Sequence, residues 1–143
     1  MNKITVETAS WYEDKEELVK LRTRVFVEEQ KVPSSLEIDG LDAECLHVKA
    51  MNGNLCIGTG RLLANGYIGR MCVLDEYRGQ GIGTMMLENL IEQALNAGHR
   101  QVLLNSQSTA IPFYQKNSFT TDSEEFIEAG IPHRRMVRNL EYK

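Results

Sequence analysis

Apolar and polar residues alternate at the start of the chain, as they do in a half-buried β-strand. This alternation over residues 4–8 predicts a strand, and apolar residues at near-helical spacing predict a helix after it. Ser10 is a candidate N-cap for this helix, with Glu13 as its capping-box partner. Pro33 ends any continuation, and the acidic segment 28–44 is expected to be an irregular functional loop or a solvated rim.

The middle of the chain predicts a meander of antiparallel strands. Mostly apolar segments over 46–50, 55–63 and 67–73 are separated by the turn sequences Asn-Gly-Asn at 52–54 and Asn-Gly at 65–66. Strands joined by such short turns pair antiparallel.

The second half of the chain alternates helical and strand patterns. Apolar residues at helical spacing over 82–94 predict a helix, which Gly98 closes as a C-cap glycine. The apolar run 102–104 predicts a strand buried on both faces. The remaining predicted elements are a short amphipathic segment over 110–116 and segments over 119–126 and 136–140. This order predicts an α/β (α+β) fold with a mixed, mostly antiparallel central sheet flanked by helices.

One segment between a predicted strand and a predicted helix is rich in glycine, namely Arg78-Gly79-Gln80-Gly81-Ile82-Gly83. Glycine lets the backbone turn sharply and approach a ligand closely. The first amides of the following helix have no intrahelical acceptor and lie at the positive end of its dipole. The segment therefore predicts a site for an anion such as a phosphate or a diphosphate.

The spacing of these glycines excludes two common nucleotide sites. A dinucleotide fingerprint Gly-x-Gly-x-x-Gly would need a further glycine where the chain has Thr84 or Met86. A P-loop would need Gly-Lys-Ser/Thr, and no lysine occurs between Lys49 and Lys116. The pattern that remains is Arg-x-x-Gly-x-Gly after a strand.

Composition and charge narrow the function further. The 143 residues are 42% hydrophobic, which suits a single domain over residues 1–143. A net charge of -4 and an isoelectric point near 5.4 argue against nucleic acid as a partner, so a small ligand is expected. Cys45, Cys56 and Cys72 lack the spacing of a disulfide framework or a metal site, so reduced thiols and no metal are expected. With no signal-peptide pattern and no long apolar run, the protein is expected to be cytoplasmic, with no membrane partner.

The glycine-rich segment resembles the acyl-CoA diphosphate loop of the GNAT superfamily of N-acetyltransferases. The resemblance spans nearly the whole chain and is specific mainly over residues 67–119. It implies that acetyl-CoA is the acyl donor and that the backbone of Cys72 and Val73 pairs with its pantetheine arm. It also implies that main-chain amides from Arg78 to Gly83 hold the diphosphate. Thr84 either adds a hydroxyl to a phosphate or meets only solvent.

A second match to the superfamily lies downstream. Asn105, the pair Phe113-Tyr114 and Asn117-x-Phe119 resemble its asparagine, its aromatic pair and its closing Gly-Phe. Asn117-x-Phe119 lacks the usual glycine, and asparagine tolerates the left-handed turn that a helix end needs. The resemblance places the aromatic pair at the cofactor. Tyr114, a phenol with an ordinary pKa of ~10, would donate a proton to the leaving thiolate. Asn105 is a further predicted catalytic and cofactor-binding residue, or it only caps the segment that follows.

Within the superfamily, the chain is similar to small bacterial acetyltransferases related to the ElaA-type proteins. The supporting segments are Val25-Phe26-Val27-Glu28-Glu29-Gln30, Glu37-x-Asp39, His47 and Ala129-Gly130-Ile131-Pro132-His133.

The acceptor site is predicted from charged and titratable residues in and near these segments. Glu28, Glu37, His47 and Arg61 are the predicted substrate-binding residues. His133, in a predicted loop, is a predicted catalytic proton acceptor. Each also has a structural explanation: carboxylates that face solvent, a histidine satisfied within the fold, or an arginine paired within the sheet. An acidic rim would suit a cationic acceptor such as a polyamine, an aminoglycoside or lysine.

These features predict an enzyme that moves an acetyl group from acetyl-CoA to a primary amine of a small molecule or peptide. The expected route is direct attack within a ternary complex, where orienting two bound reactants can lower the barrier by ~7 to 11 kcal/mol. The alternative is a non-catalytic acyl-CoA-binding sensor or regulator. The sequence leaves monomer and homodimer both open.

Overall fold

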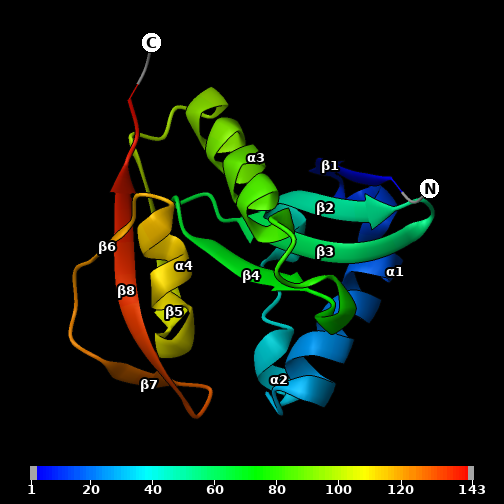
Figure 1. The fold of residues 1–143 in the computed structure, drawn as a ribbon, viewed down its shortest axis with the longest axis horizontal. Helices are drawn as coiled ribbons and strands as arrows, with labels where there is room; N and C mark the ends of the chain where they lie inside the picture. The colour runs from blue at the N-terminus through cyan, green and yellow to red at the C-terminus, as the bar shows by residue number, and fades with distance from the viewer. Residues whose placement is uncertain (1–2, 142–143) are drawn as a thin grey trace.

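The computed structural model describes residues 3–141, which form two β-sheets with helices packed against them (Figure 1). The strands are β1 (Ile4–Ala9), β2 (Leu46–Asn52), β3 (Leu55–Leu62), β4 (Ile68–Val73), β5 (Gln101–Gln107), β6 (Thr120–Thr121), β7 (Phe126–Glu128) and β8 (Ile131–Asn139). The helices are α1 (Trp11–Arg22), α2 (Ser34–Glu37), α3 (Ile82–Asn96) and α4 (Ile111–Lys116). All pairings between these strands are antiparallel, so the predicted α+β class is confirmed.

The first sheet has the order β1-β2-β3-β4 and contains the predicted meander. Gly53 and Gly66 adopt positive φ angles of 59° and 91° in the two predicted turns. The second sheet has the order β5-β8-β6, and β7 pairs with β8 beyond the end of β6. The first sheet thus ends at β4, and the second begins at β5.

Strands β4 and β5 come together at one point and then diverge (Figure 1). An isolated parallel bridge joins Tyr67 to Leu103, where the Leu103 N–H donates to the Gly66 carbonyl at 3.0 Å. A Cβ at Gly66 would lie 3.2 Å from the Gln101 carbonyl oxygen, so glycine permits this close approach. Beyond the bridge the facing edges of the two sheets are open to each other.

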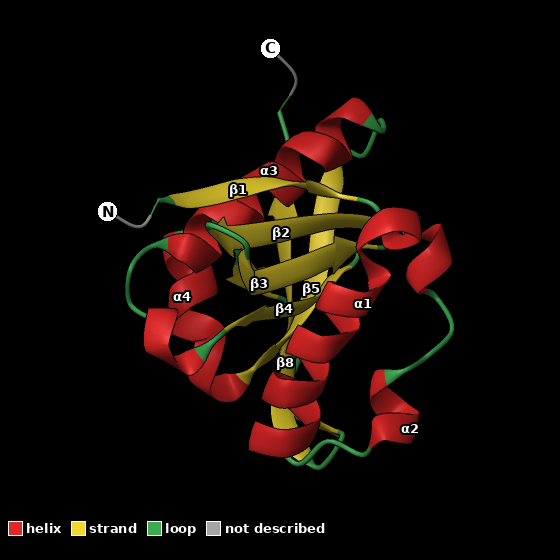
Figure 2. Ribbon diagram, turned by 90° about the vertical axis from the view of Figure 1, so that its right-hand side faces the viewer, coloured by secondary structure: helices red, strands yellow, loops and turns green. Residues whose placement is uncertain are grey.

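Helices α1 and α3 cover opposite faces of the first sheet (Figure 2). Strand β3 is accordingly buried at every position after Leu55. The predicted apolar face of α3 supplies buried residues to this core, and Gly98 ends the helix with a φ of 92°, as expected. None of the helices within residues 3–141 has the length and apolar character that a membrane crossing requires.

The structure corrects the sequence predictions in the N-terminal third. The Ser10 side chain makes no capping bond; instead its N–H donates to Asp14 Oδ2 at 2.9 Å. A π-helical segment, Thr23–Glu29, continues α1. The predicted irregular segment 28–44 contains α2 and a 3₁₀ turn, Asp42–Glu44, because buried ion pairs described below hold it in place.

The C-terminal predictions also need correction. Strand β5 alternates between buried and exposed residues, so it is not buried on both faces. The predicted segment 119–126 divides into β6 and β7, separated by polar residues. Strand β8 begins at Ile131 because Ala129 and Gly130, with φ of 52° and 76°, form a two-residue turn that pairs Ile131 with Glu128. His133 therefore lies in a strand and not in a loop.

The end of α4 adopts a left-handed turn one residue later than predicted. Asn117 has a φ of -100°, and Ser118 takes the left-handed conformation with a φ of 70°. The Phe119 N–H then donates to the Tyr114 carbonyl at 3.0 Å and closes the helix. Ser118 thus occupies the strained position where glycine is favoured.

Candidate active site

The glycine-rich segment lies where β4 leads into α3, as its sequence predicts. Gly79 and Gly81 have φ angles of 78° and 81°, a region that side chains rarely adopt. The first amide that donates within α3 belongs to Met85, whose N–H bonds the Gly81 carbonyl at 3.2 Å. The amides of residues 82–84 therefore precede the first helical bond and form, with the helix dipole, a positive cradle for an anion.

Arg78 fixes this loop rather than offering a free donor to it. Its N–H donates to the Asp75 carbonyl at 3.2 Å, so this amide is engaged within the loop. Its guanidinium forms a two-pronged ion pair with Glu29, at 2.8 and 2.9 Å, and donates to the Val73 carbonyl at 2.9 Å. The ion pair ties the loop to the π-helical segment after α1.

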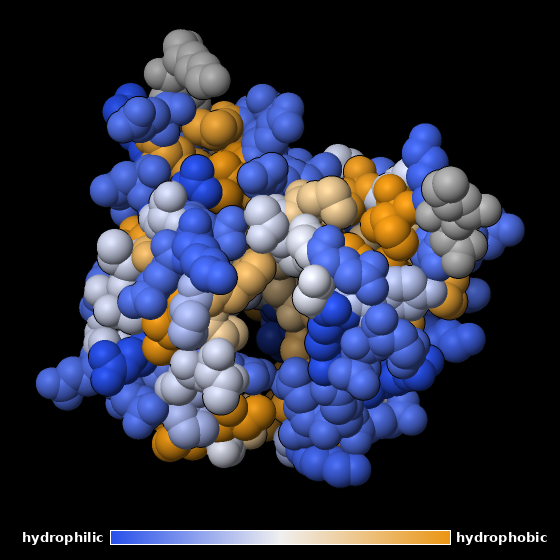
Figure 3. Space-filling model, in the orientation of Figure 1, coloured by the Kyte–Doolittle hydropathy of each residue, from blue (hydrophilic) through white to orange (hydrophobic). Residues whose placement is uncertain are grey.

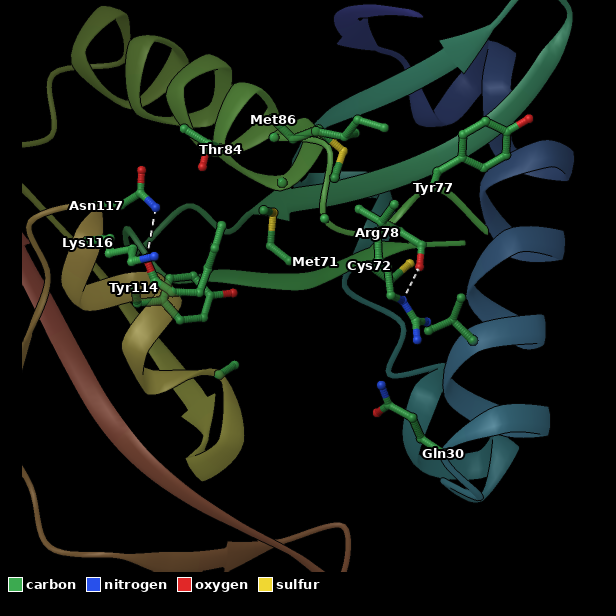
Figure 4. A pocket seen from close by; sticks show the side chains of 18 residues that line it. Gln30, Met71, Cys72, Tyr77, Arg78, Thr84, Met86, Tyr114, Lys116 and Asn117 are labelled. Atoms are coloured by element: carbon green, nitrogen blue, oxygen red, sulfur yellow. Dashed lines mark hydrogen bonds between the residues drawn. The ribbon is translucent and has the colours of Figure 1, made fainter. Parts of the chain in front are cut away.

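A first cavity of about 620 Å³ opens beside the loop, within the size range of ligand sites. Figure 4 shows its walls. Strand β4 contributes Met71 and Cys72, and α3 contributes Thr84 and Met86. Helix α4 contributes Tyr114 and Lys116, and Asn117 follows its end. Val73, Ile82 and Phe113 also line it. Because β5 has diverged, the edge of β4 opposite β3 borders this cavity, where the predicted backbone contacts of Cys72 and Val73 would form.

Gly83 sits where α3 meets α4. A Cβ at this position would lie 3.2 Å from Cζ of Phe113. The absence of a side chain therefore allows the cradle and the aromatic residues of α4 to border one cavity.

Tyr114 is a half-buried residue that borders two cavities. Its ring meets Phe113 and Phe119 edge-on, with centroids 5.0 and 5.8 Å away. Burial raises the pKa of Tyr114 to about 12. Among the described residues nothing hydrogen-bonds its hydroxyl, so the proton is available to a ligand.

A second cavity, also of about 620 Å³, lies between the two sheets, where Figure 3 shows a hollow between the halves of the molecule. It shares Gln30, Met71, Ala110 and Tyr114 with the first cavity. Asn105, Glu37, Arg61 and His133 from the predicted site also line it. The two cavities therefore adjoin at Tyr114, and Asn105 faces the second cavity rather than the cradle.

His133 is buried in β8 with its ring fixed in one orientation. Its Nδ1 lies 2.6 Å from the Ile131 carbonyl oxygen, which can only accept, so Nδ1 carries the proton. Nε2, the other ring nitrogen, lies 3.6 Å from the Glu128 carboxylate. Stacking on Phe126, with centroids 6.0 Å apart, completes this arrangement. The ring is thus held at the wall of the second cavity.

Three carboxylates of the predicted acidic rim instead belong to a network of ion pairs. Arg22 is 2% exposed and binds Glu37 at 2.5 Å and Asp42 at 2.7 Å. Arg61 is 3% exposed and binds Asp42 at 2.9 Å as well as Asp39. Burial alone would raise the pKa of Asp42, but the two arginines outweigh it and hold that pKa below its usual range. These three carboxylates are therefore neutralised within the fold, whereas Glu28 and Glu44 of the same segment are exposed.

Two predicted substrate-binding residues lie away from the cavity linings. His47 is buried, stacks on Trp11 at 5.3 Å, and its Nε2 is 2.9 Å from the Asp42 carbonyl oxygen. Burial lowers its pKa, as expected for a structural histidine. Glu28 is exposed on the π-helical segment. In the loop, Gln80 is also exposed and lines neither cavity.

Met71, Gln30 and Arg70 each line a cavity, although none of them is predicted from the sequence as a site residue. Met71 and Arg70 lie in a predicted strand, where their side chains gave no signal distinct from packing or solvent exposure. Gln30 belongs to the segment that supported the ElaA-type resemblance, but no role followed from that.

Comparisons with known proteins agree with this geometry. The family model described as "Acetyltransferase (GNAT) domain" matches residues 10–140. A curated relative from Bacillus subtilis, the "Uncharacterized N-acetyltransferase YjcF", is 39% identical over 83% of this chain and 88% of its own length.

Solved structures show the same fold. An acyl-CoA N-acyltransferase from Pseudomonas aeruginosa is 29% identical, with a TM-score of 0.83 over 95% of this chain and 99% of that one. Escherichia coli ElaA is 27% identical, with a TM-score of 0.85 over 94% of this chain and 99% of that one. The resemblance predicted from the sequence is thereby confirmed, including its link to ElaA.

We predict that Gly83→Glu lowers the affinity for CoA at least about 100-fold, because a carboxylate beside the cradle repels a diphosphate and its side chain crowds Phe113. Calorimetric titration with CoA measures the loss. Asn96→Glu adds the same charge at the far end of α3 and should leave the affinity within about twofold. Equal affinity of the two variants would contradict a diphosphate site at the cradle.

Proposed function

Because the chain belongs to the GNAT acetyltransferase family, we propose that it transfers an acetyl group from acetyl-CoA to a primary amine held in the second cavity. The observation that carries this proposal is the junction of the two cavities at Tyr114 and Met71. A donor in one cavity and an acceptor in the other would meet there. Holding two reactants in this way can contribute ~7 to 11 kcal/mol to catalysis.

The residues of the first cavity suit acetyl-CoA. The free amides of residues 82–84 provide donors for a diphosphate, and the open edge of β4 can pair with an extended, amide-containing arm. Lys116 lines the same cavity and adds a positive charge. When bound, acetyl-CoA supplies an acetyl group activated as a thioester.

His133 and Tyr114 divide the proton transfers between them. An alkyl ammonium must lose a proton before it attacks, and Nε2 of His133 can accept that proton while Ile131 orients the ring. The C–N bond then forms as the C–S bond breaks, and Tyr114, whose hydroxyl burial keeps neutral, protonates the departing sulfur. The second proton of the amine nitrogen passes, directly or through water, to the tyrosinate that this leaves, and His133 releases the first proton to solvent.

Release of free thiol from acetyl-CoA, measured across a panel of primary amines, tests the proposal. Amine-dependent release is expected, with the N-acetyl product identified by mass spectrometry. Tight binding of CoA with no amine-dependent release would contradict catalysis and favour an acyl-CoA sensor.

We predict that Tyr114→Phe lowers kcat roughly 100-fold, because the leaving sulfur loses its proton donor, while CoA affinity stays near normal. The raised pKa of Tyr114, about 12, also predicts how the effect of this substitution depends on pH. The phenol keeps its proton as pH rises, so the ratio of wild-type to variant rates should stay constant from about pH 7 to about pH 10. A ratio that falls toward one with a midpoint near pH ~10 would assign Tyr114 an ordinary pKa.

We predict that His133→Asn lowers kcat roughly 100-fold near neutral pH. The Asn side-chain amide can still donate to the Ile131 carbonyl, so the strand is preserved, but the acceptor at Nε2 is lost. The defect should shrink as pH approaches the pKa of the amine, because free amine then needs no base. Unchanged kcat near neutral pH, in a variant that melts like the wild type, would exclude His133 as the base.

A further inference from the structure

Strand β4 contains a bulge that redirects one arginine. On β3, Thr59 and Arg61 face Cys72 and Gly69, so two residues of β4, Arg70 and Met71, stand opposite a single residue of β3. Arg70 has a φ of 52°, in the left-handed region that is strained for a residue with a side chain. Bulges of this kind re-aim side chains near functional sites. Both bulge residues line the second cavity.

The guanidinium of Arg70 is fixed on one side and unused on the other. Nη2 donates to the carbonyls of Leu36 and Glu37 at 3.2 and 2.9 Å, and Nε donates to the latter at 3.3 Å. Its side chain is 26% exposed, and in residues 3–141 no group accepts a hydrogen bond from Nη1. The side chain is therefore held in position with a donor to spare.

The carboxylates near Arg70 are shared with two closer arginines. Glu37, Asp39 and Asp42 are bound closely by Arg22 and Arg61, and Arg70 forms longer ion pairs, at 3.4 Å from Asp39 and 3.9 Å from Glu37. Burial, followed by the charge of neighbouring Arg61, lowers the pKa of Arg70. Nη1 of Arg70 is therefore the donor that this side chain has left for an anion in the cavity.

The other wall of the cavity has the opposite character. It is formed by β7 and β8 (Figure 1). These strands carry Glu128, whose side chain is 53% exposed, and His133, whose Nε2 lies 3.6 Å from the Glu128 carboxylate. This pair can attract an ammonium group and take its proton. The rest of the lining is mixed, with the apolar residues Phe26, Leu63 and Ile131 beside the polar residues Asn105, Ser106 and Gln107.

We propose that the acceptor is an amino carboxylate, with its amine at His133, its carboxylate on Arg70 and a hydrocarbon link between them. This inference rests on the proposed acetyl transfer and names its substrate class. It replaces the cationic amine expected from the sequence, because Glu37, Asp39 and Asp42 on the Arg70 side of the cavity are already ion-paired.

A matched acceptor panel tests the inference. The panel contains α-amino acids with apolar side chains and unbranched ω-amino acids of graded length. Each amino acid is compared with its own carboxamide, and diamines of the same lengths are included. The wild type should favour at least one carboxylate over its own carboxamide by about 10- to 100-fold in kcat/KM. Arg70→Gln should remove this preference by raising KM for the carboxylate, while kcat/KM for the carboxamide changes little. Arg70→Lys, which keeps the charge but loses the planar fork, should fall between them.

The controls separate this inference from the proposed function. Arg100→Gln removes an exposed arginine that lines neither cavity and should keep the preference. CoA affinity should be equal in all variants. Turnover of carboxamides or diamines as fast as carboxylates would overturn the inference and leave the proposed function standing.

A binding measurement covers the case in which no acceptor is turned over. The CoA-saturated protein is titrated with the N-acetyl derivatives of the same amino acids and of their carboxamides. A carboxylate preference that Arg70→Gln abolishes would support the anion site even if acetyl transfer failed. The absence of any preference in the wild type would overturn the inference without reference to the variants.

Discussion

The divergence of β4 and β5 is the constraint on which the rest of the site depends. The two strands are held together by one bridge, at Tyr67 and Leu103, and Gly66 permits the close approach there. Beyond the bridge each strand has an edge that the other sheet does not cover, in the middle of the molecule. Backbone groups in such a place need partners. An extended ligand that lies along β4 provides them, so the same divergence creates the space and the recognition surface.

The buried ion pairs hold the wall that faces this opening. Arg22 on α1 and Arg61 on β3 both bind Asp42. Arg22 also binds Glu37, and Arg61 also binds Asp39. Burying such charges is costly, and loss of one partner typically destabilises by about 3–5 kcal/mol because the other charge is left unpaired. The network therefore contributes a fixed geometry more than net stability. Its effect at the site is to present backbone carbonyls to Arg70 and to neutralise the carboxylates of that wall.

The sequence predicted those features that depend on local backbone chemistry. The glycines at 79, 81 and 83 predicted an anion cradle between a strand and a helix, and the turns at Gly53 and Gly66 predicted the antiparallel meander. The ion pairs could not be predicted in this way, because Arg22 and Arg61 lie far from Asp42 in the sequence and only the folded chain selects partners. The bulge at Arg70 could not be predicted either, because arginine rarely adopts a positive φ angle and its presence gives no sign of a bulge.

The environments of the titratable groups argue for direct transfer with His133 as base. Asp39 and Asp42 have pKa values held low by arginines, so they are poor proton acceptors at neutral pH. Burial raises the pKa of Cys72 to about 12, which keeps the thiol protonated and unsuited to forming an acetyl-cysteine intermediate. Tyr114 is likewise held neutral and can serve as an acid but not as a base. His133 lines the second cavity with its ring held by the Ile131 carbonyl, and this placement supports the proposed route for the proton of the amine.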